Sequence, residues 1–147
     1  MDAFSTDELF SIKNFFWQGN YSLVLAEDTN LFSPEGQEQA SLYCYRARIA
    51  LGEAAAVAKE LATTSVSKRP ELVAICGLAE AVLGRRERAL RMVKPLLKLV
   101  PSSPEIVPGT NVVLASAMYL LGDIEETMQV LDACVEDPES YVHIIIV

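Results

Sequence analysis

Four glycines recur along this chain at nearly equal intervals, and each one follows an apolar pattern with helical spacing. They are separated by 33, 32 and 38 residues: Gly19, Gly52, Gly84 and Gly122. Glycine adopts the left-handed backbone conformation that ends many helices at no steric cost, so each position predicts an elbow between two helices. A catalytic turn would not need four copies. The spacing therefore predicts a helix hairpin that repeats along the chain.

A period near 34 residues with two helices per period is typical of tetratricopeptide repeats, whose hairpins stack to bury their apolar faces. We therefore predict an all-α, tetratricopeptide-like right-handed solenoid of about four helix hairpins, with the repeat domain over residues 1–137. No further elbow glycine follows Pro138. Residues 138–147 are expected to be an irregular tail or the start of an incomplete fifth repeat, which makes the solenoid C-terminally truncated.

Local signals predict where the first helices of two hairpins begin. Ser5 and Glu8 have the spacing of a capping box, in which each side chain bonds the other residue's backbone N–H. Ser33 followed by Pro34 combines a good N-cap residue with a proline in the first turn. Both patterns predict helix starts at these places.

The third hairpin fits the repeat consensus best. Gly77 suits the point where two helices touch, and Ala89 is the small residue expected early in the second helix. Pro95 lies inside that second helix and is expected to kink it, because proline removes one backbone hydrogen bond. Pro101 is expected to end it.

Composition limits the possible classes of protein. The formal net charge is −8 over 147 residues, which argues against general affinity for nucleic-acid phosphates or anionic lipid. The first ten residues begin acidic, so no signal peptide is expected. Cys44, Cys76 and Cys134 are widely spaced within helical patterns and are predicted to be unpaired core thiols of a cytoplasmic protein.

Motifs of known catalytic chemistry are not found in the sequence. Its one histidine, His143, lies within the last five residues, and no cluster of Cys, His or Asp has the spacing of metal ligands. Phosphate-binding glycine loops and nucleophile elbows are also lacking. We therefore expect a protein that is not an enzyme and that has no cofactor, no metal and no small-molecule substrate.

One helical stretch is strongly basic. Its cations recur every three or four residues on one face, with Arg85 and Arg86 just before them: Arg88, Arg91, Lys94 and Lys98. They can form a solvated outer face or a docking stripe for an acidic partner or a membrane surface. Second helices of such hairpins form the outer wall of a solenoid, so this stripe is expected to face away from the inner groove.

Three stretches near the start of the chain resemble a known family. "DELFSIKNFFWQGNYSLVLAE" followed by "SPE" and "LYCYRARIALG" resembles the epsilon subunit of coatomer, the COPI vesicle coat. The resemblance covers roughly the first 50 residues. The positions that match the family pattern are Asp7, Glu8, Leu9, Phe10, Ile12, Lys13, Asn14, Gly19, Tyr21, Ser33, Pro34 and Glu35.

This resemblance implies a structural coat subunit whose solenoid grips the C-terminal region of the alpha coat subunit. It also implies a role in retrograde transport from Golgi to endoplasmic reticulum and in intra-Golgi transport. The protein would be cytoplasmic and would cycle onto Golgi membranes and COPI-coated vesicles as a peripheral protein, through the coat. No nucleic acid is expected as a partner.

The partner site is expected in the groove lined by the first helices. Residues three or six positions before the elbow glycines share one helix face, and their mixture of apolar, aromatic and cationic groups suits a few anchors of a partner segment. These predicted partner-binding residues are Lys13, Phe16, Arg46, Ile49, Leu78, Ser116 and Tyr119. Among the three consecutive aromatics of residues 15–17, Phe16 or Trp17 is the candidate for partner contact.

An alternative interpretation is a general tetratricopeptide adaptor or co-chaperone that clamps the acidic C-terminal peptide of another protein. Such a clamp needs several cations in the groove. The third and fourth first helices, residues 71–83 and 111–121, contain no Lys or Arg. This disfavours the clamp and leaves the coat subunit as the preferred prediction.

Overall fold

The computed structural model describes residues 7–64, 68–102 and 106–132, and every regular element within these ranges is a helix. The predicted all-α fold is confirmed. The helices are α1 (Phe10–Trp17), α2 (Tyr21–Ala26), the short 3-10 helix η1 (Thr29–Leu31), α3 (Pro34–Ala50), α4 (Ala54–Glu60), α5 (Pro70–Val82), α6 (Arg86–Val93), α7 (Leu96–Ser102), α8 (Thr110–Leu120) and α9 (Ile124–Asp132).

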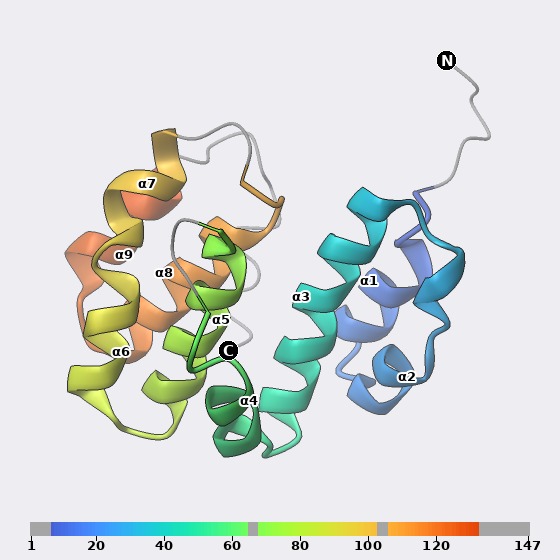
Figure 1. Ribbon diagram of the computed structural model, residues 1–147, viewed down its shortest axis with the longest axis horizontal. Helices are drawn as coiled ribbons and strands as arrows, with labels where there is room; N and C mark the ends of the chain where they lie inside the picture. The colour runs from blue at the N-terminus through green and yellow to red at the C-terminus, as the bar shows by residue number, and fades with distance from the viewer. Residues whose placement is uncertain (1–6, 65–67, 103–105, 133–147) are drawn as a thin grey trace.

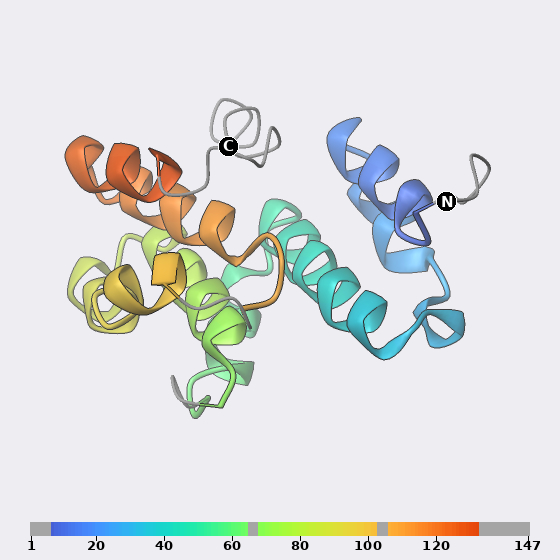
Figure 2. The same ribbon diagram turned by 90° about the horizontal axis from the view of Figure 1, so that it is seen from above.

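The helices pair into hairpins that follow one another in chain order. Figure 1 shows α3 between the α1–α2 hairpin and the remaining helices, and Figure 2 shows the same order from above. Helix α5 makes its most extensive contacts with α6, its hairpin partner, and with α8, the first helix of the next hairpin. This stacking of neighbours is the arrangement that a helical-repeat solenoid requires.

All four elbows use the same helix cap. At the third elbow Gly84 has φ +76°, its N–H donates to the Ala81 carbonyl at 3.0 Å, and the Arg85 N–H donates to the Glu80 carbonyl at 2.9 Å. This pair of bonds is a Schellman motif, which satisfies carbonyls left open at a helix end. The same two bonds and a positive φ recur at the other elbow glycines: Gly19, Gly52 and Gly122. The predicted elbows are confirmed.

The third hairpin is as closely packed as its small residues predict. A Cβ atom added to Gly77 would lie 2.6 Å from Val93 Cγ1 of α6, and Ala89 is fully buried. Pro95 interrupts the second helix, which stops at Val93 and resumes as α7 at Leu96. The prediction that Pro101 ends this helix is wrong by one residue, because α7 includes Pro101 and runs to Ser102.

Buried apolar side chains form two clusters, and α3 contributes to both. A small cluster joins α1, α2 and α3 through residues such as Ile12, Val24 and Tyr43. A larger cluster extends from α3 to α9 and includes Ile49 and Ile75. The α3 helix is thus the wall between the two cores, with one face turned to each.

Glu8 binds Ser33 of the second hairpin and does not act through the predicted capping box. Ser5 lies outside the described residues, and the Glu8 carboxylate accepts hydrogen bonds from the Ser33 N–H at 2.7 Å and the Ser33 hydroxyl at 2.6 Å. Ser33 in turn caps α3, since its hydroxyl oxygen accepts from the Gly36 N–H at 3.1 Å. Glu8 therefore ties the start of the first hairpin to the start of the second.

Two of the three cysteines lie among the described residues, and both are free thiols. Cys76 is buried and Cys44 is half-buried. Burial raises the pKa of both thiols, and the charge of Glu80 raises the pKa of Cys76 further. Both therefore remain protonated and weakly reactive at neutral pH. Cys134 and the predicted tail, residues 138–147, lie outside the described residues.

Candidate functional site

The first helices enclose a cavity of about 370 Å³ near the elbow ends of the hairpins. Helices α1, α3, α5 and α8 each contribute to its lining, so four hairpins meet there. Five of the seven predicted partner-binding residues line it: Phe16, Arg46, Ile49, Leu78 and Ser116. The spacing from the elbow glycines therefore brought together residues that are far apart in the sequence. We call this space the groove cavity.

Among the described residues that line the groove cavity, Arg46 is the one Lys or Arg, and aromatic rings lie against it. Its guanidinium carbon lies 4.5 Å from the centre of the Phe16 ring and 5.6 Å from that of Tyr43. Phe16 also meets Tyr43 and Tyr21 edge to face, at centroid distances of 5.3 and 5.6 Å. A desolvated cation over an aromatic face is attracted by the ring quadrupole. These rings therefore hold a positive charge, only 7% exposed, beside an apolar cavity.

Two predicted residues do not line the groove cavity. Lys13 forms an ion pair with Asp7 at 2.5 Å, near the start of α1. This pair and a bond from the Leu9 N–H lower the pKa of Asp7, although burial alone would raise it. Tyr119 is 45% exposed and lies apart from the cavity lining.

Sequence reasoning missed three residues of the cavity lining: Tyr21, Ala50 and Val82. Tyr21 lies two positions after an elbow glycine, whereas Ala50 and Val82 each lie two positions before one. Extending the offset argument by one more position on the first helices would have found the last two. Val82 is 46% exposed, so it forms part of the rim.

Ser116 offers less to a partner than a serine usually can. Its hydroxyl donates to the Val112 carbonyl one turn earlier in α8, at 2.9 Å. The residue is buried, and its hydroxyl hydrogen already has an acceptor, so Ser116 adds only a small surface to the cavity. The groove cavity therefore offers mainly apolar contacts, with the charge of Arg46 as its main polar feature.

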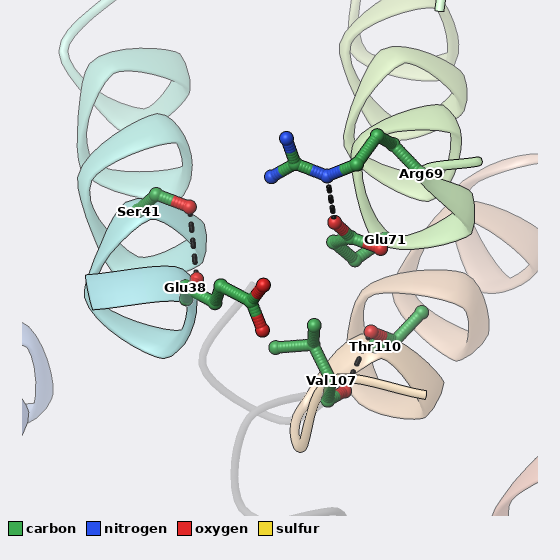
Figure 3. A network of polar contacts seen from close by, with 6 residues as sticks. All are labelled: Glu38, Ser41, Arg69, Glu71, Val107 and Thr110. Carbon is green, nitrogen blue, oxygen red and sulfur yellow. Dashed lines mark hydrogen bonds and ion pairs between the residues drawn. The ribbon is translucent and has the colours of Figure 1, made fainter. Parts of the chain in front are cut away.

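A polar network lies at the opposite ends of the same first helices. Figure 3 shows Arg69 at the start of α5 paired with buried Glu71, at an Nε–Oε1 distance of 2.6 Å, while Glu38 of α3 points into the same space. The hydrogen bond to Glu71 raises the pKa of Arg69, against the opposing effect of burial, and the charge of Glu38 adds to the rise. The Arg69–Glu71 pair thus lies within the start of α5, and α3 contributes the nearby charge of Glu38.

Within the described ranges, no group of three or more His, Cys, Asp or Glu residues could hold a metal ion. In the same part of the chain, none of the helices has both the length and the apolar character needed to span a bilayer.

Comparison with protein families matches residues 5–145 to the coatomer epsilon subunit. This chain belongs to the coatomer epsilon subunit family. The family resemblance carried by the first 50 residues is thus confirmed, and the match extends over the later hairpins as well.

A curated member of the family gives the scale of the similarity. The chain is 33% identical over 78 residues to the probable coatomer subunit epsilon of Schizosaccharomyces pombe. The aligned part covers 53% of this chain and 26% of that protein, so the similarity spans about a quarter of the relative's length. The comparison with solved structures finds no match.

Proposed function

We propose that this chain is a structural subunit of the COPI vesicle coat and holds a segment of the alpha coat subunit in its groove cavity. Membership of the coatomer epsilon subunit family supports the role in the coat. The observation that supports the site is the meeting of Phe16, Arg46 and Ile49 with residues of α5 and α8 around one cavity. Through the coat the protein associates with Golgi membranes as a peripheral, cytoplasmic component of retrograde and intra-Golgi transport.

The cavity lining indicates what the partner segment presents. Aliphatic and aromatic walls favour apolar anchors, because a few well-buried apolar side chains supply most of the binding energy at an interface. Arg46 lies against this wall with its guanidinium stacked on Phe16. The positive charge of Arg46 favours a partner segment that brings a carboxylate or a helix-end carbonyl close to it.

The groove cavity does not favour the adaptor that clamps a peptide carboxylate. Such a clamp places several cations around one carboxylate. Among the described residues that line the cavity, Arg46 is the single Lys or Arg, and α5 and α8 contribute none. The coat-subunit proposal therefore remains preferred over the adaptor.

The test measures binding of the full chain to the C-terminal region of the alpha coat subunit by isothermal titration calorimetry. Ala50→Glu with Val82→Glu places two carboxylates at the exposed part of the cavity lining. We expect binding to weaken by about 2 kcal/mol or more, which is roughly a thirtyfold rise in Kd. Circular dichroism is expected to be unchanged, since both side chains are exposed.

Ala55→Glu with Ala56→Glu is the matched control, because both residues are exposed on α4, away from the cavity, and the change in charge is the same. Phe16→Ala with Ile49→Ala also removes anchors, but both side chains are buried, so this variant tests binding only after its stability has been measured. Normal binding by the Ala50/Val82 variant would contradict the proposed site. If the Arg88→Glu, Arg91→Glu double variant is the only one that loses binding, the binding site lies on the outer helices instead.

A further inference from the structure

Half of the chain's basic residues lie within a single stretch of fourteen. Residues 85–98 hold six of the twelve Lys and Arg, with Glu87 as the one acid among them. All six basic side chains are exposed along α6 and α7. We call them the cationic surface: Arg85, Arg86, Arg88, Arg91, Lys94 and Lys98. It lies on second helices of the hairpins, whereas the first helices supply most of the groove cavity.

Folding accounts for two of these six cations. Arg86 donates through Nη1 to the Leu121 carbonyl, at the C-terminal end of α8, where a cation also favours the helix dipole. Arg85 pairs with the buried carboxylate of Glu80, at 3.4 Å. Both contacts stabilise the packing of the third hairpin, so these two arginines have a structural role.

Arg88, Arg91 and Lys94 have no such role in the part of the chain that the structure describes, where none of them makes a hydrogen bond or an ion pair. Their like charges repel one another, and Glu87 is the one acidic residue within residues 85–98 to offset the repulsion. A set of unpaired cations that costs stability and serves no contact within the fold points to a ligand of opposite charge.

The surface is hollowed beside these residues. One hollow of about 520 Å³ is lined by charged side chains alone, among them Arg85, Arg88 and Arg91. A second hollow of about 380 Å³ lies between α4 and α6, and its lining includes Ala58, Ala62 and Met92. Arg88 and Arg91 line both hollows. The first hollow is charged, and the second combines apolar side chains with the carboxylate of Glu80, so the two adjoin across the same two arginines.

We propose that the cationic surface binds an acidic protein segment that carries an apolar side chain beside its carboxylates. Arg88 and Arg91 pair with the carboxylates, since the planar guanidinium binds a carboxylate through two parallel hydrogen bonds. The apolar side chain enters the hollow between α4 and α6, against Ala62 and Met92. This site is separate from the groove cavity, so both can be occupied at once.

The charge distribution favours an acidic segment over an anionic membrane. Residues 85–98 contribute a net charge of +5 to a total of −8, so the rest of the chain carries −13. The net negative charge of the rest of the chain is repelled by an anionic bilayer, an effect that salt screens beyond about 8–10 Å. A single segment meets only the cationic surface, and it can enter hollows that a planar membrane cannot fill.

The test uses the full chain and a fluorescein-labelled peptide of alternating Asp and Glu with one central Leu, measured by fluorescence anisotropy. We expect Arg88→Glu with Arg91→Glu to weaken binding at least tenfold, and replacing the central Leu by Ser to weaken it roughly tenfold as its apolar contact is lost. Raising salt from about 50 to about 200 mM is expected to weaken binding steeply, because the contacts are ionic.

Lys59→Glu with Lys68→Glu is the matched control, since both lysines are exposed, lie outside both hollows and change the net charge equally. It is expected to weaken binding less than about threefold, through net charge alone. Equal weakening by the two double variants, or no binding of the peptide, would overturn the proposal. So would binding to phosphatidylserine vesicles without binding to the peptide. If the charge reversal unfolds the chain, Arg88→Gln with Arg91→Gln is the deciding variant, checked by circular dichroism.

Discussion

The α1–α2 and α5–α6 hairpins share one elbow design and differ in what fills the space between their helices. Seven residues before the elbow glycine, the first hairpin has Ile12 and the third has Gly77. Five residues after the elbow, the first has Val24 and the third has Ala89. All four positions are buried. The same loop thus joins two helices with large aliphatic side chains at these positions in one hairpin and two helices with glycine and alanine there in the other.

This difference separates two functions of a repeat sequence. The elbow sets the chain reversal, because each of the four elbow glycines makes the same backbone hydrogen bonds. The filling residues set the distance between the helices and the side chains available for other contacts. In the first hairpin, Phe16 contacts Tyr43 and Arg46 of α3 and so forms a wall of the groove cavity.

The largest expected effect comes from truncating a buried side chain between the helices of the first hairpin. Ile12 is fully buried in the small cluster, so Ile12→Ala leaves a void among few neighbours and is expected to cost about 3 kcal/mol. Urea denaturation measures this loss, and hydrogen exchange is expected to show α1 and α2 opening before α5. Phe10→Ala is the control, since Phe10 is 61% exposed. A loss under about 1 kcal/mol would show that the first hairpin does not depend on this filler.

A smaller effect is expected from adding one methyl group to the third hairpin. In Gly77→Ala the new Cβ atom would lie 2.6 Å from Val93 Cγ1, so either the Val93 side chain must shift or α5 and α6 must separate. We expect a cost of about 2 kcal/mol, even though alanine favours helix formation. Thermal or urea unfolding measures it.

A double-mutant cycle with Val93→Ala sharpens this test, because removing Val93 Cγ1 makes room for the added methyl group. The two changes together are expected to cost at least about 1 kcal/mol less than their sum. Additive costs would show that the contact between Gly77 and Val93 does not set the distance between α5 and α6.

Several features of the fold could be predicted because their signals are local in the sequence. The elbow glycines, the Ser33–Pro34 helix start and the break at Pro95 each depend on the backbone preferences of one or two residues. The offsets from the elbows then identified Phe16, Arg46 and Ile49 as residues on one side of the first helices, and they line the groove cavity. Their predicted role in partner binding stays a prediction.

Other features could not be predicted because they depend on contacts between hairpins. Glu8 meets Ser33 across twenty-five residues, which no local pattern indicates. Tyr119 shares its offset with Phe16 and Ile49, and each of those two is covered by the hairpin that follows it. Tyr119 has no such cover from the described residues and is 45% exposed. Equal positions within a repeat thus have unequal environments in the stack.

The smallest expected effect concerns how the first hairpin is attached to the second. Glu8→Ala removes the acceptor for the Ser33 N–H and hydroxyl and is expected to cost about 1 kcal/mol, because the bonds are charge-assisted but exposed. Since Glu8 joins α1 to α3, hydrogen exchange is expected to speed up in residues 10–26 and to stay unchanged in α5. Glu35→Ala is the matched control, because Glu35 also lies in the first turn of α3. Its loss removes only a favourable interaction with the helix dipole and is expected to cost about 0.3–0.5 kcal/mol. Equal effects of the two variants would show that Glu8 acts on the dipole of α3 alone, and the first hairpin would then be attached by its apolar cluster without this cap.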